Sequence, residues 1–429
     1  MYNVGLISLG CVKNTVDSEA ILAMLKQEDF NITTDLNNCD LIMINTCGFI
    51  LDAKVEAINV ILKALEYKKK TIVLGCLVER YEKELRAEFP EVDAFVSLDE
   101  YDKLPDIIDK LMNDKVVERK FDIFNRVLST PSYMAYLKIS EGCDNFCAFC
   151  AIPFIRGRFH SFKMDELVNY AKDLAKMGVK ELVVISQDTV SYGKDLKDGS
   201  NLYKLLKELD QIDGLEFIRV LYTYPQGIND DLLHLIANSK KITHYFDIPL
   251  QHCNTRVLKS MNRHDTKETI VDLYKRIKAI VPDATLRTTL IAGFPGETDE
   301  EAKELLDFIK DIRFNHVGVF TFSKEEGTKA ALLKGQIDDE TKAKRKDALM
   351  VEQKHISYEL NKAMIGNIYK AIVTKVLPNN EYEVRSTFNS PDDIDGSVIL
   401  QNAKVHKEGD LIKIKITHAF VYDLICEEV

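Results

Sequence analysis

Hydrophobic and polar residues alternate with two different periods along this chain. In the first part, short apolar runs are separated by longer stretches in which apolar residues recur every three or four positions. Continuous apolar runs are typical of strands buried on both faces, and the longer period is typical of amphipathic helices. This part therefore predicts a doubly wound parallel sheet. The expected strands are Asn3 to Leu9, Asp40 to Asn45, Thr71 to Leu74 and Ala94 to Ser97, and the expected helices are Asp17 to Gln27, Asp52 to Tyr67 and Val78 to Phe89.

The alternation of strands and helices resumes after a charged, proline-containing stretch, which we interpret as a linker. Six strand-helix units follow it, and six such units predict a partial (β/α)6 barrel of the TIM type. The expected strands are Met134 to Ser140, Glu181 to Gln187, Phe217 to Tyr222, Tyr245 to Leu250, Thr285 to Ala292 and His316 to Phe322, and the expected helices are Asp165 to Met177, Leu202 to Leu209, Asp230 to Ala237, Lys267 to Ile280, Glu300 to Ile312 and Asp339 to Lys362.

From Gly366 onward the pattern changes to short strands with a period of two. Such a series predicts a small antiparallel barrel, about the size of an oligonucleotide-binding module. The chain is thus expected to be a multidomain α/β protein with domains at 1–117, 132–362 and 365–429 and a linker at 118–131. The expected strands of the last domain are Ile368 to Val376, Glu381 to Ser386, Gly396 to Leu400, Leu411 to Ile416 and Phe420 to Cys426.

Composition narrows the class of protein. With 429 residues, 46% of them hydrophobic and 29% charged, the chain is an ordinary globular protein with sizeable cores. No apolar run is long enough to span a bilayer, and the start has no basic stretch followed by an apolar segment. We therefore expect a cytoplasmic protein without a membrane partner.

Nine cysteines in such a compartment indicate metal or catalytic chemistry rather than disulfides. Three of them, Cys143, Cys147 and Cys150, form a CxxxCxxC motif directly after the first expected barrel strand. A structural zinc site needs four closed ligands, whereas three thiolates can hold three irons of a 4Fe-4S cluster and leave the fourth iron open. A zinc or redox-thiol loop is the alternative. Loops at the carboxyl ends of barrel strands are also where catalytic groups of such barrels lie.

Three further cysteines, Cys11, Cys47 and Cys76, each follow the end of a strand expected in the first domain. Because the carboxyl ends of parallel strands lie together at one edge of a sheet, these thiols can meet although they are far apart in sequence. The alternative is that small buried cysteines pack well at strand ends. The repeated placement favours a second cluster held by three thiolates.

A CxxxCxxC loop on the first strand of a six-unit barrel resembles the radical S-adenosylmethionine superfamily. The resemblance implies that S-adenosylmethionine binds the open iron and is cleaved to a 5′-deoxyadenosyl radical. Phe149 matches the aromatic residue that the family places near the adenine. Gln187 and Asp188 end the second barrel strand and are candidate cofactor contacts, and Arg156 offers a planar guanidinium for a carboxylate of the cofactor or of a substrate.

The order of the three domains is similar to that of the methylthiotransferases, whose last module is a TRAM domain. This resemblance implies two 4Fe-4S clusters. The first would be an auxiliary cluster on Cys11, Cys47 and Cys76 that carries the sulfur, and the second a radical-generating cluster on Cys143, Cys147 and Cys150. No catalytic residue is assigned beyond these ligands, and the pattern names neither an electron donor nor a sulfur source.

Three motifs resemble the RimO type of methylthiotransferase, which modifies an aspartate of the twelfth small-subunit ribosomal protein. They are the run from Ser8 to Glu19, the run from Asp247 to His252 and the run from Gly318 to Thr328, although Val12 stands where many members have proline.

The last module carries seven Lys and Arg against ten Asp and Glu, a net charge of −3. This charge suits a basic ribosomal protein better than transfer RNA as the partner. A transfer RNA adenosine methylthiotransferase and a noncatalytic iron-sulfur or zinc protein acting on a ribosomal partner are the alternatives.

Overall fold

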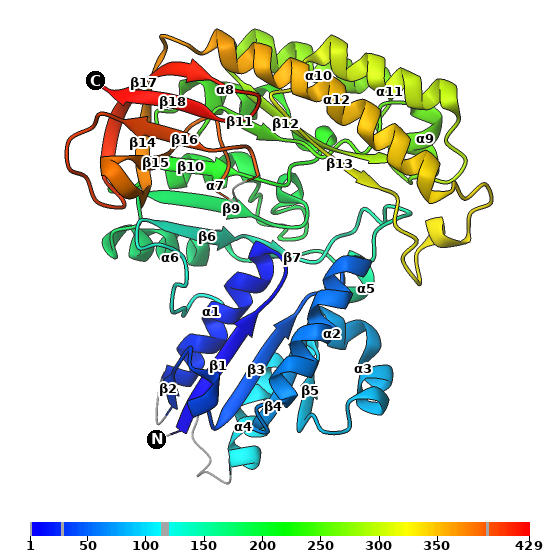
Figure 1. Cartoon of the computed structure of the whole chain (residues 1–429), viewed down its shortest axis with the longest axis vertical. Helices are drawn as coiled ribbons and strands as arrows, with labels where there is room; N and C mark the ends of the chain where they lie inside the picture. Colours follow the sequence, from blue (N-terminus) through cyan, green and yellow to red (C-terminus); the bar gives the residue numbers. More distant parts are fainter. Residues whose placement is uncertain (1, 27–29, 113–119, 392–393) are drawn as a thin grey trace.

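The computed structural model describes residues 2–26, 30–112, 120–391 and 394–429, and it contains three structural units (Figure 1). A parallel sheet lies at the foot of the molecule, a curved layer of parallel strands lies above it, and a small closed barrel lies beside that layer. Gln27 and residues 118 and 119 of the expected linker lie outside the described residues. Within the described ranges, no helix is long and apolar enough to cross a membrane.

The amino-terminal unit is a five-stranded parallel sheet with the order β2-β1-β3-β4-β5. Successive residues of β3 point to opposite faces, since Leu41 and Met43 pack with α1 and α4 whereas Ile42 and Ile44 pack with α2 and α3. The doubly wound prediction is confirmed, while β2 and α4 were not predicted. The bounds are β1 (Tyr2–Ser8), α1 (Val12–Lys26), β2 (Phe30–Ile32), β3 (Leu41–Thr46), α2 (Leu51–Leu65), β4 (Lys70–Gly75), α3 (Cys76–Glu88), β5 (Ala94–Val96) and α4 (Leu104–Met112).

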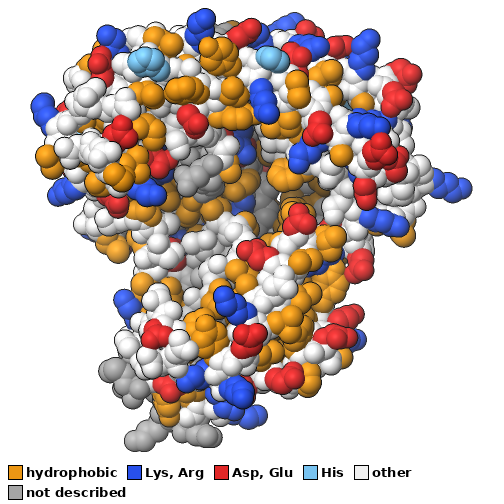
Figure 2. Space-filling view, in the orientation of Figure 1, with side chains coloured by type: hydrophobic (Ala, Val, Ile, Leu, Met, Phe, Trp, Pro, Cys, Tyr) orange, Lys and Arg blue, Asp and Glu red, His pale blue; other side chains and the backbone are white. Residues whose placement is uncertain are grey.

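Helix α2 is apolar on two sides. Ala57 and Ile61 are fully buried against the sheet, while Leu51 and Leu62 are 59% and 51% exposed. Together with Val55 and Ile58 they form a line of hydrophobic side chains along the outer face of the helix (Figure 2). The apolar periodicity that predicted α2 therefore combines two stripes, and only one of them reaches the core.

The central unit is a partial barrel of six parallel strands. They form two three-stranded sheets, β10-β9-β6 and β11-β12-β13, which a parallel bridge between Ile218 and Ile242 connects. Every predicted strand and main helix of this unit is present. The bounds are β6 (Met134–Lys138), α6 (Met164–Lys176), β9 (Glu181–Ile185), α7 (Leu202–Asp210), β10 (Phe217–Val220), α8 (Asp230–Asn238), β11 (Tyr245–Asp247), α10 (Lys267–Ile280), β12 (Thr285–Ala292), α11 (Asp299–Ile312), β13 (His316–Thr321) and α12 (Asp339–Ala363).

The interior of this partial barrel is filled from two directions. Along β9, Leu182 and Val184 pack with the surrounding helices, whereas Val183 faces the interior. There Val183 shares one apolar cluster with Val16 of α1 and with Ile372 of β14 (Ile368–Val376). Both flanking units therefore contribute to the core of the barrel.

The carboxyl-terminal unit is a closed barrel with the order β14-β15-β16-β18-β17. The expected small barrel is confirmed: four of its five strand pairs are antiparallel, and the pair of β16 with β18 is parallel. Strand directions can alternate around a closed ring only when the number of strands is even, and five strands force at least one parallel pair. The remaining bounds are β15 (Tyr382–Ser386), β16 (Val398–Gln401), β17 (Leu411–Ala419) and β18 (Leu424–Glu428).

Candidate iron-sulfur and cofactor site

The three strand-end cysteines of the amino-terminal sheet lie at one edge. Cys11 precedes α1, Cys47 follows β3 and Cys76 is the first residue of α3, and their strands β1, β3 and β4 are neighbours. The approach is close: a Cβ on Gly10 would lie 2.5 Å from the Cβ of Cys47, and Gly10 has a φ of +86°. Glycine is required there because any other residue would be both strained and in collision.

These thiols also interact electrostatically. Burial raises the pKa of Cys76 to about 12, and the charges of Cys11 and Cys47 also raise it. Burial also raises the pKa of Cys47. Without a metal, buried thiols of this kind keep their protons, and a bound metal would displace them.

The second triplet lies on a loop that begins at a short hairpin, β7 (Ser140–Glu141) with β8 (His160–Ser161), which was not predicted. The loop is fixed from several directions. The backbone of Ala148 donates to the carbonyl of Met261 at 2.8 Å and accepts from the amide of Ala330 at 2.7 Å. The side chain of Asn262 donates to the carbonyl of Phe146 at 2.9 Å. A loop held in this way can present its thiols in a fixed arrangement.

Burial raises the pKa of Cys143 to about 11 and that of Cys150 to about 12, and each also responds to the charge of Cys147. Among the residues that the structure describes, no three His, Cys, Asp or Glu side chains converge on a point that one metal ion could occupy. A zinc ion needs its sulfur ligands about 2.3 Å away. Each triplet offers three thiols, one fewer than a closed zinc site needs.

Two unpaired polar atoms lie beside the CxxxCxxC loop. Asp188 accepts from the side chain of Asn145 at 2.8 Å with one carboxylate oxygen, and its other oxygen is buried without a partner. Gln187 donates to Glu141 at 2.7 Å, and its amide oxygen is likewise buried and unpaired. Such atoms are costly unless a ligand donates to them, so they fit the amino or hydroxyl groups of a cofactor. Phe149 is half-buried and packs on the apolar cluster around Phe294.

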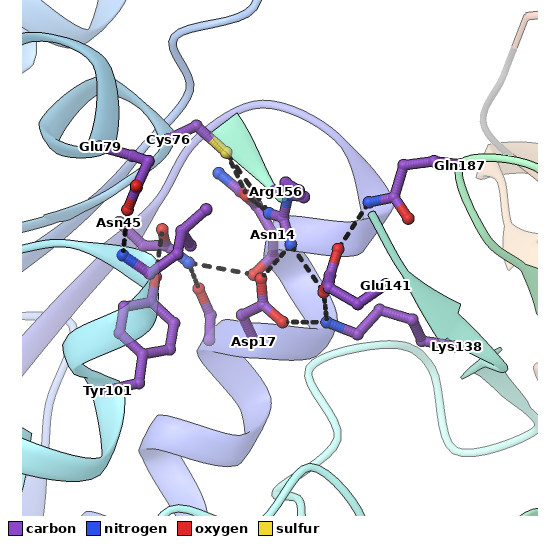
Figure 3. Close-up of polar contacts among 12 residues, drawn as sticks. Asn14, Asp17, Asn45, Cys76, Glu79, Tyr101, Lys138, Glu141, Arg156 and Gln187 are labelled. Atoms are coloured by element: carbon purple, nitrogen blue, oxygen red, sulfur yellow. Dashed lines mark hydrogen bonds and ion pairs between the residues drawn. The ribbon is translucent and has the colours of Figure 1, made fainter. Parts of the chain in front are cut away.

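Arg156 does not point into open space. Its guanidinium is paired with Asp17 at 2.9 Å and Glu141 at 3.1 Å, and it donates to Asn14 and to the Sγ of Cys76 at 3.4 Å (Figure 3). This residue follows the second triplet in sequence but contacts a thiol of the first.

Lys138 completes a buried charge network at the junction of the two units. Its ammonium pairs with Asp17 and, at 2.6 Å, with Glu141. Burial acts to raise the pKa of Glu141, but Lys138 and Arg156 outweigh it and hold this pKa at about 2. Glu141 therefore stays ionised beside the two cations.

Five residues at this site carried no assignment from the sequence, namely Asn14, Asp17, Lys138, Glu141 and Arg263. Arg263 is buried; it donates to the carbonyl of Pro249 at 2.9 Å and lies 4.0 Å from the centre of the Tyr224 ring. It also contacts Cys147, where it opposes the effect of burial, which raises the pKa of that thiol. Of these five residues, Lys138 alone could have been noticed in the sequence, because a lysine in an otherwise apolar strand needs a buried partner.

Comparison with known proteins gives the family. The Radical SAM superfamily model matches residues 137–309, the uncharacterized protein family UPF0004 matches residues 3–97, and the TRAM domain matches residues 365–429. The chain is 45% identical over 438 residues to the ribosomal protein uS12 methylthiotransferase RimO of Thermoanaerobacter sp. (strain X514), and the match covers 100% of both chains. The chain belongs to the RimO family. A RimO of Acetivibrio thermocellus is 44% identical over 99% of this chain and 98% of its own.

Solved structures agree on the fold of this RimO family member. The radical S-adenosylmethionine methyltransferase TsrM from Kitasatospora setae superposes with a TM-score of 0.55 at 12% identity, covering 74% of this chain and 73% of TsrM. The cobalamin-dependent S-adenosylmethionine radical enzyme OxsB gives a TM-score of 0.52 at 15% identity, covering 83% of this chain and 56% of OxsB. The superfamily match supports an iron-sulfur cluster and S-adenosylmethionine as cofactors.

Proposed function

We propose that this chain is a radical S-adenosylmethionine methylthiotransferase that replaces a β-carbon hydrogen of an aspartate in ribosomal protein uS12 with a methylthio group. The observation that carries the proposal is the full-length similarity to proteins named uS12 methylthiotransferase RimO. The arrangement of the two thiol triplets on facing units supports it, because sulfur insertion needs a radical source and a sulfur carrier close together.

In this proposal, Cys143, Cys147 and Cys150 hold the radical-generating 4Fe-4S cluster, and Cys11, Cys47 and Cys76 hold the auxiliary one. When bound, the first cluster supplies the electron that cleaves S-adenosylmethionine, and the second supplies the sulfur. The protein side chains position these groups and exclude water around them, as the burial of Cys47 and Cys76 indicates.

The cofactor contacts that we propose are Gln187, Asp188 and Phe149. The unpaired oxygens of Gln187 and Asp188 would accept hydrogen bonds from S-adenosylmethionine, and the half-buried ring of Phe149 would cover one side of it. Arg156 was also expected to contact the cofactor. Because its guanidinium is engaged by Asp17, Glu141 and Cys76, we assign it to the auxiliary triplet instead.

We also propose the division into domains at 1–117, 132–362 and 365–429 with a linker at 118–131, the last domain recognising the substrate protein. The carboxyl-terminal barrel contacts Glu181, Phe217 and Tyr245, the first residues of β9, β10 and β11, whereas the CxxxCxxC loop follows the other end of the barrel strands. The acidic domain therefore packs at the end of the partial barrel opposite to the CxxxCxxC loop.

One experiment decides between the substrates. Anaerobically reconstituted enzyme, reductant and S-adenosylmethionine are incubated with uS12 and, separately, with transfer RNA, and both are analysed by mass spectrometry. We expect the mass increase of one methylthio group on uS12 alone, and modification of only the RNA would contradict the proposal. Iron analysis separates the noncatalytic zinc alternative, since two 4Fe-4S clusters give about eight irons per chain.

A further inference from the structure

Arg156 is the one side chain described above that contacts a thiol of the first triplet and an acidic neighbour of the second. We propose that Arg156 is a positioning residue that raises the reduction potential of the auxiliary cluster through its hydrogen bond to Cys76. The inference rests on the proposed function, because it takes Cys76 as a ligand of that cluster.

The sequence places Arg156 at this point through helix packing. It ends the short helix α5 (Ile152–Ile155), which starts soon after Cys150, and its amide donates to the carbonyl of Ile152 at 2.8 Å. Ile155 and Ala151 form a buried apolar cluster with Cys76, the first residue of α3. This contact of α5 with α3 fixes the guanidinium 3.4 Å from the Sγ of Cys76.

The contact is charge-assisted and shielded from water. The side chain of Arg156 is only 3% exposed, so solvent screens its charge very little. Reduction adds negative charge to an iron-sulfur cluster, and hydrogen bonds or positive charge at its sulfur atoms stabilise the reduced form. Removing the guanidinium therefore makes the auxiliary cluster harder to reduce.

The partners of Arg156 explain why it keeps this position. Asp17 follows Cys11 on α1, and Glu141 precedes Cys143 on the hairpin, so the guanidinium joins one carboxylate beside each triplet. Lys138 bridges the same two carboxylates. With Lys138 in place, the carboxylates keep one cation when Arg156 is replaced, which limits the damage to folding.

The test measures the reduction potential of each cluster separately in the full chain. Replacing Cys143, Cys147 and Cys150 by alanine leaves only the auxiliary cluster, and replacing Cys11, Cys47 and Cys76 leaves only the other. Into each background we introduce Arg156→Gln, Arg156→Lys or Arg158→Gln, count the iron, and titrate the potential by electron paramagnetic resonance. Arg158 is the matched control, because it is two residues away and its side chain is 74% exposed.

We expect Arg156→Gln to shift the auxiliary potential to a more negative value, Arg156→Lys to shift it less, and Arg158→Gln to leave it unchanged. The radical-generating cluster should keep its potential in all three variants. An unchanged auxiliary potential in an iron-replete Arg156→Gln protein, or an equal shift in both clusters, overturns the inference. If this variant loses its auxiliary iron, the lysine variant decides, and a potential equal to that of the unsubstituted arginine overturns the inference.

Failure of the proposed function looks different. If the proposed function is wrong, the protein with Arg156 intact either holds no auxiliary cluster or leaves uS12 without a methylthio group. The inference fails on its own when that protein holds both clusters and modifies uS12 while the Arg156 variants keep the auxiliary potential.

Discussion

At the scale of single residues, alanine at one thiol of each triplet separates the roles proposed for the two triplets. Cys11 is exposed, so its replacement by alanine leaves no cavity in the core. We expect Cys11→Ala to abolish methylthiolation of uS12 while S-adenosylmethionine is still cleaved, because the radical-generating triplet is untouched. Cys147→Ala should abolish both reactions. The products are measured as 5′-deoxyadenosine by chromatography and as methylthio-uS12 by mass. Full insertion by Cys11→Ala would refute the auxiliary assignment.

Gly10 offers a second prediction at this scale. Alanine at this position would meet Cys47 at 2.5 Å and would keep an unfavourable positive φ. We expect Gly10→Ala to push the Cys11 loop away from Cys47 and to reduce bound iron to about half, the content of one 4Fe-4S cluster.

The matched control for this variant is Gly178→Ala. Gly178 has a φ of +98° but has nothing within 4 Å of an added Cβ. Both variants lose about 1 kcal/mol or more of stability through backbone strain. Only Gly10→Ala should lose iron, and equal iron contents would show that the collision with Cys47 is unimportant.

At the scale of elements, an ion-pair cluster fastens the amino-terminal sheet to the loop after β13. Glu325 pairs with Lys54 of α2 at 2.8 Å and with Arg80 of α3 at 3.3 Å, and its side chain is 4% exposed. Arg80 also donates to the carbonyl of Gly48, directly after Cys47. The cluster therefore links the first triplet to the last barrel strand.

We expect Glu325→Gln to loosen this connection, because two largely buried cations lose their counter-charge. Hydrogen exchange should rise in α2 and α3 and stay unchanged in α7 and α8. Glu326→Gln is the matched control, since the exposed Glu326 contributes only its carbonyl to Arg80. Equal exchange in the two variants would show that the ion pairs do not hold the units together.

The elements that the sequence predicted are the long ones with a clear period. The strands and main helices of the barrel were predicted because each buries a continuous apolar stripe. The hairpin of β7 with β8, the helix α5 and α9 (Thr255–Ser260) were missed, since segments of two to six residues are held by tertiary contacts rather than by their own pattern. Asp17 and Glu141 were missed as partners of Arg156 for the same reason, because pairing across units leaves no local signal.

At the scale of the whole molecule, a buried ion cluster joins the carboxyl-terminal barrel to the partial barrel. Glu181, at the start of β9, is fully buried between Arg219 of β10 and Arg385 of β15, with contacts of 3.1 and 2.5 Å. Arg219 also donates to the carbonyl of Ser386 at 2.9 Å. The interface therefore depends on ion pairs that are buried away from water. The carboxyl-terminal barrel is thus part of the folding unit of the enzyme.

Arg385→Leu tests this dependence. Loss of one partner of a buried carboxylate typically lowers the free energy of unfolding by about 3 to 5 kcal/mol. Because Glu181 keeps its pair with Arg219, we expect a decrease of about 3 kcal/mol. Urea unfolding at pH 7 measures it. The matched control is Lys370→Gln at the same interface, where the pair with Glu216 is more than a third exposed and its loss should cost less than about 1 kcal/mol.

The pH dependence of the Arg385→Leu effect gives a sharper test. Burial acts to raise the pKa of Glu181, but Arg385 and Arg219 outweigh it, so this pKa lies below its ordinary value. A carboxyl group whose pKa is lowered by folding stabilises the protein above its unfolded pKa of about 4.3, and this contribution disappears as the pH falls through the folded value. The difference in unfolding free energy between the original chain and Arg385→Leu should therefore be largest near neutral pH and shrink in acid. A difference that stays constant from pH 7 into acid would mean that the arginine acts through packing rather than through its charge.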